Sequence, residues 1–412
     1  MSSIFVLMST CALLAAIAAG AELLARLWSR RQGYFVHRRW ERTRMVLGES
    51  AGLSLESTVI FEVNGDGERG DPLPHNRDGL YRVLVAGGSA VECGLLDQTS
   101  AWPSVVQRIL NHRDALNALG ARRVHVGNVG RSLTPVSVIK QILKSTLPRY
   151  EKLDLVILMV GGSDAIEWME LKTPARLRET PTDSGRGFRE NPLERFGWGL
   201  RRLALRRLAG QYWRRYRRPV CIREDFSRKL LELRQARQQA SQLIGAFPDP
   251  SPMLDHLEHN LRQTVAVARA KGARVVIVRQ HWLDKILTPE EEALMWNFRR
   301  GRIFGDGKED DAYFTHDAVR DLLWKVDRRI ARAAEALGVE QVDLSAALTP
   351  SLENFYDFIH FTPAGARRVA DVVAAAVLNP CLVGDLGRLG LAVGVKTANI
   401  SDTRTGIMVK PA

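Results

Sequence analysis

Residues 82–94 read RVLVAGGSAVECG, an apolar β-branched run followed by two glycines and a serine. The apolar run predicts a buried strand over 82–86. Gly87 and Gly88 permit a sharp turn after it, so Ser89 stands where the chain leaves a sheet and starts a helix. Taken alone, the pattern also fits an ordinary strand-to-helix turn in which Ser89 is only the helix cap.

The same alternation of strand and helix continues along the chain. Strands are predicted at 123–126, 153–160, 273–278 and 339–342, and helices at 102–110, 136–147, 254–270, 318–337 and 363–378. Alternating strands and helices predict a parallel sheet covered on both faces, an α/β fold. The run LDLVILMV at 153–160 is typical of a central strand. A site is therefore expected beyond the C-terminal ends of the strands.

A second segment with candidate catalytic residues, DFIHFTPAG, occupies residues 357–365. It sets Asp357 three residues before His360, just ahead of a helix with Thr362 as its cap. A serine hydroxyl becomes a good nucleophile when a neutral imidazole takes its proton, and that imidazole needs a carboxylate to fix its tautomer. One short turn could supply both groups to Ser89.

Two glycine-bearing segments also end at this edge of the sheet, GNVGRS at 127–132 and MVGGSD at 159–164. The N–H of Gly130 and the hydroxyl of Ser163 are candidate hydrogen-bond donors to the negative oxygen of a tetrahedral intermediate. The four segments together are far more specific than any one of them.

Their order resembles blocks I, II, III and V of the SGNH/GDSL hydrolases, over roughly residues 81–378. The resemblance implies a flavodoxin-like three-layer α/β/α sandwich with a parallel sheet. It also implies that Ser89 is the nucleophile, His360 the base and Asp357 its carboxylate partner. The oxyanion hole would comprise the Ser89 N–H, Gly130 and a block III asparagine.

The sequence departs from the family pattern in two places. Gly88 replaces the aspartate of GDS, and Ser163 replaces the block III asparagine. A serine hydroxyl reaches less far than an amide, so the resemblance implies a weaker or rearranged oxyanion hole at Ser163, with Asn128 as a candidate substitute donor.

The N-terminal stretch 4–27, IFVLMSTCALLAAIAAGAELLARL, is long enough to cross a bilayer. A cleaved signal peptide is the alternative, but no basic residue precedes the apolar run, which favours an uncleaved single-pass anchor at 1–30. Many arginines follow the span, so the positive-inside rule places the bulk of the protein in the cytoplasm, whereas the resemblance favours the outer side. The orientation stays open.

The remaining chain divides into a basic juxtamembrane segment and loop at 31–80, an SGNH-like domain at 81–380 and a tail at 381–412. Within the domain, residues 165–252 lack a clear strand and read as a helical, arginine-rich insertion or lid. An apolar helix face is predicted there from Trp198, Leu200, Leu203, Leu208 and Tyr212. Such a basic helix could lie on an anionic membrane, hold an acidic polymer, or be a solvated helix packed on the core.

The charge balance of 59 Lys and Arg against 46 Asp and Glu gives +13 and favours anionic partners such as acidic glycans or lipid headgroups. No nucleic-acid-binding motif accompanies it, so no nucleic-acid partner is expected. The four cysteines, Cys11, Cys93, Cys221 and Cys381, form no CxxC pair, and His256 with His259 lacks a third ligand, so neither a metal nor a cofactor is expected. Oligomeric state is not readable.

These observations predict a membrane-anchored serine ester hydrolase that removes an acyl group, in one reading an O-acetyl group, from a carbohydrate or polysaccharide. A lipid ester is an alternative substrate, and transfer to a sugar hydroxyl is an alternative reaction because it shares the acyl-enzyme. A catalytically silent scaffold that binds a glycan or an envelope complex is the alternative that Ser163 favours. Near the site, Cys93 is expected to pack beneath it, and His281 either lines it or ends a strand.

Overall fold

The computed structural model describes residues 2–47, 54–179, 185–192, 195–224, 226–303 and 311–379, so the predicted tail at 381–412 lies outside it. Its centre is a sheet of five parallel strands in the order β10-β8-β5-β3-β4. These strands are β3 (Leu80–Gly87), β4 (Arg123–Asn128), β5 (Leu155–Met159), β8 (Arg274–Arg279) and β10 (Glu340–Asp343). Each coincides with a predicted strand.

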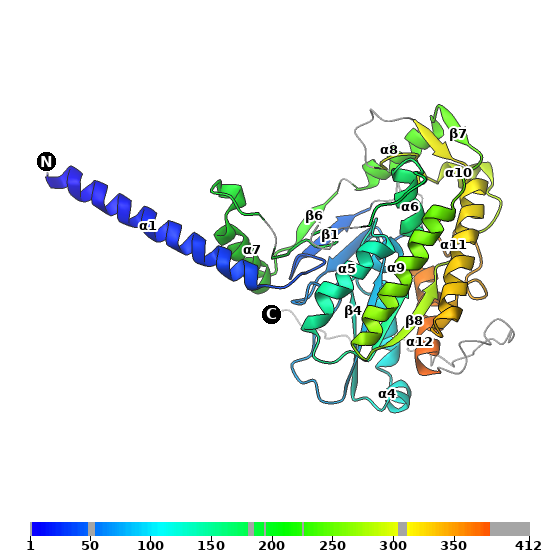
Figure 1. The fold of residues 1–412 in the computed structure, drawn as a ribbon, viewed down its shortest axis with the longest axis horizontal. Helices are drawn as coiled ribbons and strands as arrows, with labels where there is room; N and C mark the ends of the chain where they lie inside the picture. Colours follow the sequence, from blue (N-terminus) through cyan, green and yellow to red (C-terminus); the bar gives the residue numbers. More distant parts are fainter. Residues whose placement is uncertain are drawn as a thin grey trace, which may run out of the picture.

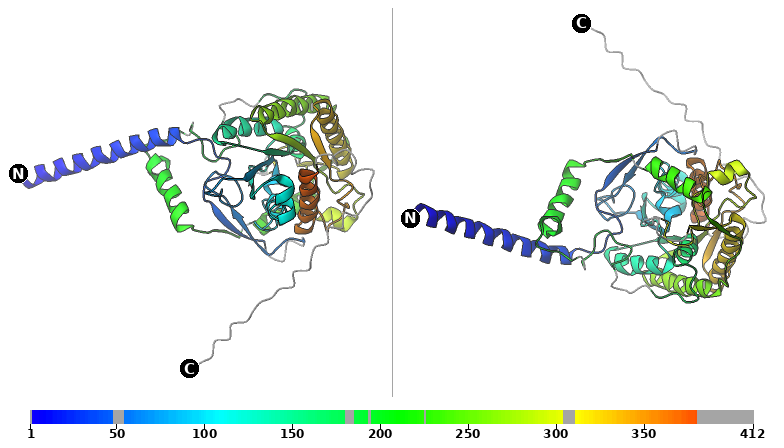
Figure 2. Two further views of the ribbon diagram at one scale, coloured as in Figure 1. Left: turned by 90° about the horizontal axis from the view of Figure 1, so that it is seen from below. Right: turned by 90° about the horizontal axis from the view of Figure 1, so that it is seen from above.

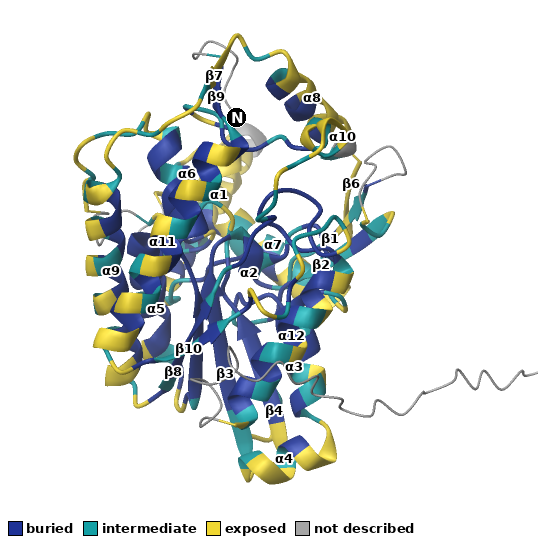
Figure 3. Ribbon diagram, turned by 90° about the vertical axis from the view of Figure 1, so that its right-hand side faces the viewer, coloured by how far each residue is buried: buried dark blue, intermediate teal, exposed yellow. Residues whose placement is uncertain are grey.

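Helices cover both faces of the sheet, as Figures 1 and 3 show, which confirms the predicted α/β/α sandwich. One face carries α5 (Val136–Thr146), α9 (Ser251–Ala270) and α11 (His316–Ala336); the other carries α3 (Trp102–Leu110), α4 (Arg113–Leu119) and α12 (Pro363–Leu378). In α9 the buried side chains recur every three or four residues, for example Leu254, Leu257 and Leu261. Each such leucine contributes about 1.5–3 kcal/mol when it is fully buried.

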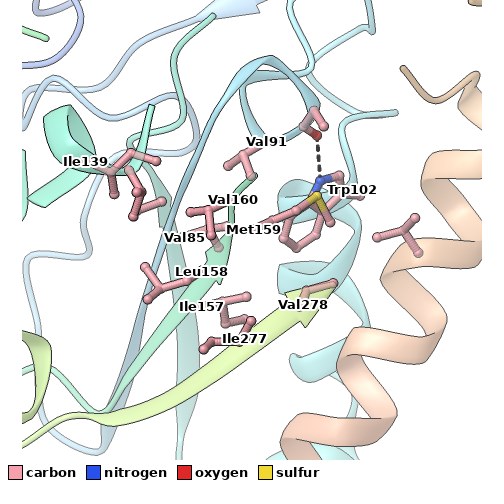
Figure 4. Packing of buried hydrophobic residues seen from close by; sticks show 14 of the residues in the cluster. Val85, Val91, Trp102, Ile139, Ile157, Leu158, Met159, Val160, Ile277 and Val278 are labelled. Atoms are coloured by element: carbon pink, nitrogen blue, oxygen red, sulfur yellow. Dashed lines mark hydrogen bonds between the residues drawn. The ribbon is translucent and has the colours of Figure 1, made fainter. Parts of the chain in front are cut away.

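The hydrophobic core lies between these layers and reaches the edge where the strands end. Val85, Ile157 and Ile277, from three neighbouring strands, are fully buried, and Figure 4 shows them packed together. The Trp102 indole N–H donates to the carbonyl oxygen of Ala90 at 2.9 Å, which ties α3 to the short helix α2 (Ser89–Glu92). This hydrogen bond from α3 therefore helps to hold the turn that bears Ser89 in place.

Further short elements complete the chain. α6 (Gly162–Glu170), α8 (Phe226–Gln238), β7 (Gln242–Ile244), α10 (Pro289–Ala293) and β9 (Ala312–Phe314) lie around the C-terminal edge of the sheet, whereas η2 (Leu147–Arg149) precedes β5 at the N-terminal edge and η3 (Leu200–Arg202) contacts α7 (Ala204–Arg217). In Figure 3, α8 and α10 stand above the strand ends on one side and α6 stands on the other. They are placed to form the rim of a site.

A second sheet joins the juxtamembrane segment to the insertion. β1 (Arg42–Val46) pairs antiparallel with β2 (Thr58–Glu62) and parallel with β6 (Cys221–Arg223). The expectation that residues 165–252 contain no strand is therefore wrong, since β6 and β7 both lie there. These strands have three residues each, too few for an alternating pattern, and their partners are remote in the sequence.

The insertion also contains α7 (Ala204–Arg217), which lies beside the C-terminal part of α1 (Ser2–Arg31), the long helix that projects from the body in Figures 1 and 2. The helix predicted from Trp198 onward begins later, and Trp198 is 62% exposed. Its start is set by α1: the Glu22 carboxylate accepts the backbone N–H groups of Ala204 at 2.9 Å and Leu205 at 3.0 Å. A cap supplied by a distant helix leaves no local sequence signal.

Candidate active site

Three of the residues singled out in the sequence meet at the C-terminal edge of the sheet. Ser89 is the first residue of α2, directly after β3, while Asp357 and His360 lie in the loop before α12. The Ser89 Oγ is 2.7 Å from His360 Nε2, and His360 Nδ1 is 2.7 Å from Asp357 Oδ2. A continuous hydrogen-bonded line therefore joins hydroxyl, imidazole and carboxylate.

The surroundings of Asp357 keep it ionised and fix the imidazole tautomer. Burial raises the pKa of its carboxyl, but His360 and the backbone N–H groups of Ile359 and His360, each 2.9 Å from Oδ1, outweigh that effect and hold the pKa below its ordinary value. A carboxylate at Oδ2 can only accept, so His360 Nδ1 donates its proton to it. The Nε2 atom is then free to accept the Ser89 proton.

Three residues that the sequence reasoning missed surround this line. The rings of Trp296 and Tyr356 lie nearly parallel to the His360 imidazole, with centroids 6.4 Å and 5.4 Å away. The Asn297 side-chain amide is 3.5 Å from Asp357 Oδ2. Tyr356 could have been found from its place beside the DFIH motif, whereas Trp296 and Asn297 follow α10 in a loop with no periodic signal.

The predicted oxyanion donors are arranged differently from the expectation. The Ser89 N–H stands at the N-terminus of α2, where a helix leaves its N–H groups without intrahelical partners. The Gly130 N–H donates to Asn128 Oδ1 at 2.8 Å, and the Asn128 amide donates to the Val91 carbonyl at 2.7 Å. The Asn128 side chain thus holds this loop by its oxygen and by one of its two amide hydrogens, and its role as a substitute donor stays a prediction.

The position of Ser163 bears on the glycine at position 88, which stands where the family pattern has an aspartate. Ser163 is the second residue of α6 and is buried. A Cβ atom placed on Gly88 would lie 2.1 Å from the Ser163 hydroxyl oxygen. An aspartate at position 88 would therefore require the Ser163 hydroxyl to move, so side chains at positions 88 and 163 compete for one space.

The segment at 31–80, expected to be a juxtamembrane stretch and loop, supports the site directly. His37 Nε2 is 3.0 Å from the Gly130 carbonyl oxygen, and burial lowers the pKa of this imidazole to about 4, so a neutral ring donates that hydrogen bond. The guanidinium of Arg69 is buried and donates to the carbonyls of Cys93 at 2.6 Å and Leu96 at 2.7 Å. These contacts hold the loops that follow β4 and α2.

A pocket of about 400 Å³ opens over Ser89 and His360. Most of its apolar lining comes from the insertion and from the loops after α10: Ile166, Phe226, Leu230, Leu233, Trp296 and Ile303. Its charged lining consists of Arg38, Glu41, Glu92, Arg131, Arg189, Arg223 and Lys229. The pocket thus has a lining that is partly apolar and, among its charged residues, mainly basic.

Neither Cys93 nor His281 lines this pocket. Cys93 is buried, burial raises the pKa of its thiol to about 11, and it packs beneath the site. The His281 ring is buried beside Trp282 and Phe355, just past the end of β8. Among the described residues there is no cluster of three or more His, Cys, Asp or Glu side chains that could hold a metal ion.

Comparison with known proteins agrees with the geometry. The sequence profile of the GDSL-like lipase/acylhydrolase family matches residues 85–368. An acetylxylan esterase from Geobacillus stearothermophilus is similar in structure, with 14% identity over 72% of this chain and 93% of that chain and a TM-score of 0.38. The inhibitor-bound aryl esterase of M. smegmatis shares 13% identity over 72% of this chain and 98% of that chain, with a TM-score of 0.37. No curated protein matches the sequence. Because the family profile spans more than half of the sequence, the chain belongs to the GDSL-like lipase/acylhydrolase family and is a carboxylic ester hydrolase.

Proposed function

We propose that this hydrolase is membrane-anchored and removes an acyl group, such as an O-acetyl group, from a carbohydrate, with Ser89 as nucleophile, His360 as general base and Asp357 as its partner. The observation that carries the proposal is the line of two 2.7 Å contacts from Ser89 through His360 to Asp357, at the floor of an open pocket. Neutral imidazole and ionised carboxylate are the protonation states that this chemistry needs.

The reaction follows from these positions. His360 Nε2 takes the proton of Ser89 as its Oγ attacks the ester carbonyl, and Asp357 stabilises the resulting imidazolium. The Ser89 N–H donates to the developing oxyanion. His360 then gives its proton to the departing sugar hydroxyl, and a water molecule, deprotonated by the same imidazole, releases the acyl group from Ser89.

The Gly130 N–H joins the oxyanion hole if it exchanges its bond to Asn128 for one to the substrate. The two acceptors compete for a single donor at 2.8 Å, so this exchange costs part of the stabilisation that the second donor supplies. The proposed hole is thus weaker than one in which the Gly130 N–H has no competing acceptor.

Labelling with a fluorophosphonate probe tests the assignment. The full-length protein should be labelled, and labelling should disappear in Ser89→Ala and in His360→Ala. Ser345→Ala, an exposed serine after β10, is the matched control and should be labelled like the wild type. Unchanged labelling of the Ser89→Ala variant would show that the nucleophile is a residue other than Ser89.

The membrane part of the proposal rests on α1 and α7. Residues 5–31 of α1 form a helix long and apolar enough to cross a bilayer, and only 6% of its apolar window is buried. On α7, beside the end of this helix, Tyr212, Trp213 and Tyr216 are exposed. Exposed Trp and Tyr side chains near the end of a span suit the membrane–water interface. Carbonate extraction of native membranes should leave the protein in the pellet.

A lipid ester is the second candidate substrate, favoured by the apolar lining of the pocket, which includes Leu230 and Leu233. Hydrolysis of 4-nitrophenyl esters of increasing chain length separates the two candidates. A preference for acetate over octanoate supports the carbohydrate ester, and the reverse preference supports the lipid.

A further inference from the structure

A second hollow lies next to the catalytic pocket. It measures about 400 Å³ and lies between α7 and the segments at 189–190 and 195–203. Arg38 and Arg189 line both hollows, so the two hollows adjoin at these side chains. We call the two adjoining hollows the groove; it extends from Ser89 to α7.

The groove is strongly basic and poorly neutralised. Besides the shared arginines, the second hollow is lined by Arg195, Arg201, Arg202, Arg206, Arg207 and Arg214. Among the described residues that line the second hollow, the one acidic residue is Glu190, which is already paired with Arg39 at 2.9 Å and Arg214 at 3.0 Å. In the described part of the chain, Arg195, Arg201, Arg202 and Arg206 have no acidic partner.

The catalytic end of the groove carries an unsatisfied donor as well. The Nη1 atom of Arg131 is buried and has no hydrogen-bond partner among the described residues. Burial lowers the pKa of this guanidinium, and the positive charge of Arg189 lowers it further, while the Glu92 carboxylate raises it. A buried donor without a partner is costly, and a bound anion that accepts from Nη1 would remove that cost.

The two faces of α7 carry different kinds of side chain. At about 100° per residue, Arg206, Arg207 and Arg214 share the face that lines the hollow. The exposed Tyr212 and Tyr216 lie on the opposite face. One helix can thus present aromatic rings to the bilayer interface and arginines to a ligand.

We propose that the groove binds a polyuronate chain, a glycan with a carboxylate on successive sugars, and delivers its acyl esters to Ser89. Guanidinium groups bind carboxylates in a bidentate geometry, and the row from Arg131 through Arg189 to α7 would hold several of them. A concave groove that ends at the nucleophile suits a chain molecule better than a flat layer of headgroups. This inference rests on the proposed function and names its substrate class.

The test uses full-length protein in phosphatidylcholine nanodiscs and measures two quantities. The first is the affinity for unacetylated polygalacturonate relative to neutral glucomannan, which requires no catalysis. The second is the release of acetate from the O-acetylated form of each polymer. We expect a preference for the polyuronate of roughly tenfold or more in both, falling as salt is added.

The triple variant Arg201→Gln, Arg202→Gln, Arg206→Gln should lose most of that preference. The matched control removes three exposed arginines at the far, N-terminal edge of the sheet, Arg113, Arg122 and Arg123, and should keep it. The net charge changes equally in the two triple variants, so a difference between them is local.

The outcomes separate the claims. A wild-type preference near one, or a preference that survives in the groove variant, overturns the groove assignment. So does a groove variant that is impaired only in nanodiscs containing phosphatidylglycerol, which assigns the arginines to lipid. Arginine-dependent binding of the polyuronate without acetate release supports the groove and overturns the proposed function instead.

Discussion

Replacing Asp357 by Asn tests the proposed mechanism at its most specific point. Oδ1 accepts two backbone N–H groups at 2.9 Å, so the amide oxygen of an asparagine must occupy that position. Its NH₂ group then faces His360 Nδ1, where Oδ2 accepted a hydrogen bond at 2.7 Å. The imidazole responds by moving its proton to Nε2, and Nε2 can no longer accept the proton of Ser89.

The expected loss is large because the wrong tautomer disables the base while leaving the shape of the site intact. We expect kcat to fall by about 10⁴-fold, which corresponds to roughly 5 kcal/mol of transition-state stabilisation. The assay is hydrolysis of 4-nitrophenyl acetate by the full-length protein, with KM and the melting temperature measured alongside. KM should change little, since Asp357 is buried and does not line the pocket.

Asp371→Asn is the matched control, because it makes the same chemical change at an exposed residue of α12 that pairs with Arg367 at 3.1 Å. Its kcat should equal that of the wild type. If Asp357→Asn folds normally and keeps kcat within tenfold, His360 does not depend on this carboxylate and the proposed proton path is wrong.

Three further perturbations follow from the packing. Gly87→Ala places a Cβ 2.2 Å from the Met159 carbonyl oxygen and should lower the free energy of unfolding by about 1–3 kcal/mol in thermal denaturation; Gly245→Ala, with open space around it, is the control, and equal stabilities would contradict the clash. Burial raises the pKa of Asp164 from its ordinary value of 3.8 to about 7. The protonated carboxyl group therefore contributes its full stabilisation below pH 3.8, and this contribution is lost as the pH rises through about 7. Asp164→Asn should therefore flatten the stability profile over that interval and raise stability at pH 8 by up to about 4 kcal/mol, and a profile that keeps its slope would refute the assignment. Glu22→Ala removes the acceptor for two N–H groups of α7 and should weaken its first turn by about 1–2 kcal/mol, seen as faster tryptic cleavage within α7, with Glu22→Gln as the milder comparison.

The central fold was readable from the sequence because its signals are local and repeated. The apolar run before Ser89 and the helical spacing over 254–270 each correspond to an element of the sandwich. The meeting of Ser89 with His360, 271 residues later, followed from the rule that parallel strands bring their carboxyl ends to one edge.

What escaped prediction depends on contacts between remote segments. β1 acquires its partner β6 from the insertion, and α7 acquires its cap from Glu22 on α1. The engagement of Gly130 by Asn128 is decided by loop geometry, which residue types alone do not specify. The basic groove was only partly foreseen: its arginines stood out in the sequence, but their continuity with the catalytic pocket through Arg38 and Arg189 did not.

The position of His37 makes the linker between α1 and the catalytic domain short. Only five residues, 32–36, lie between Arg31, the last residue of α1, and His37, which lines the pocket and supports the Gly130 loop. Even fully extended, the six Cα-to-Cα steps from Arg31 to His37 span roughly 20 Å. With α1 in a bilayer, this short linker would keep the catalytic serine close to the membrane surface. Only esters within that distance of the surface would then count toward the effective substrate concentration.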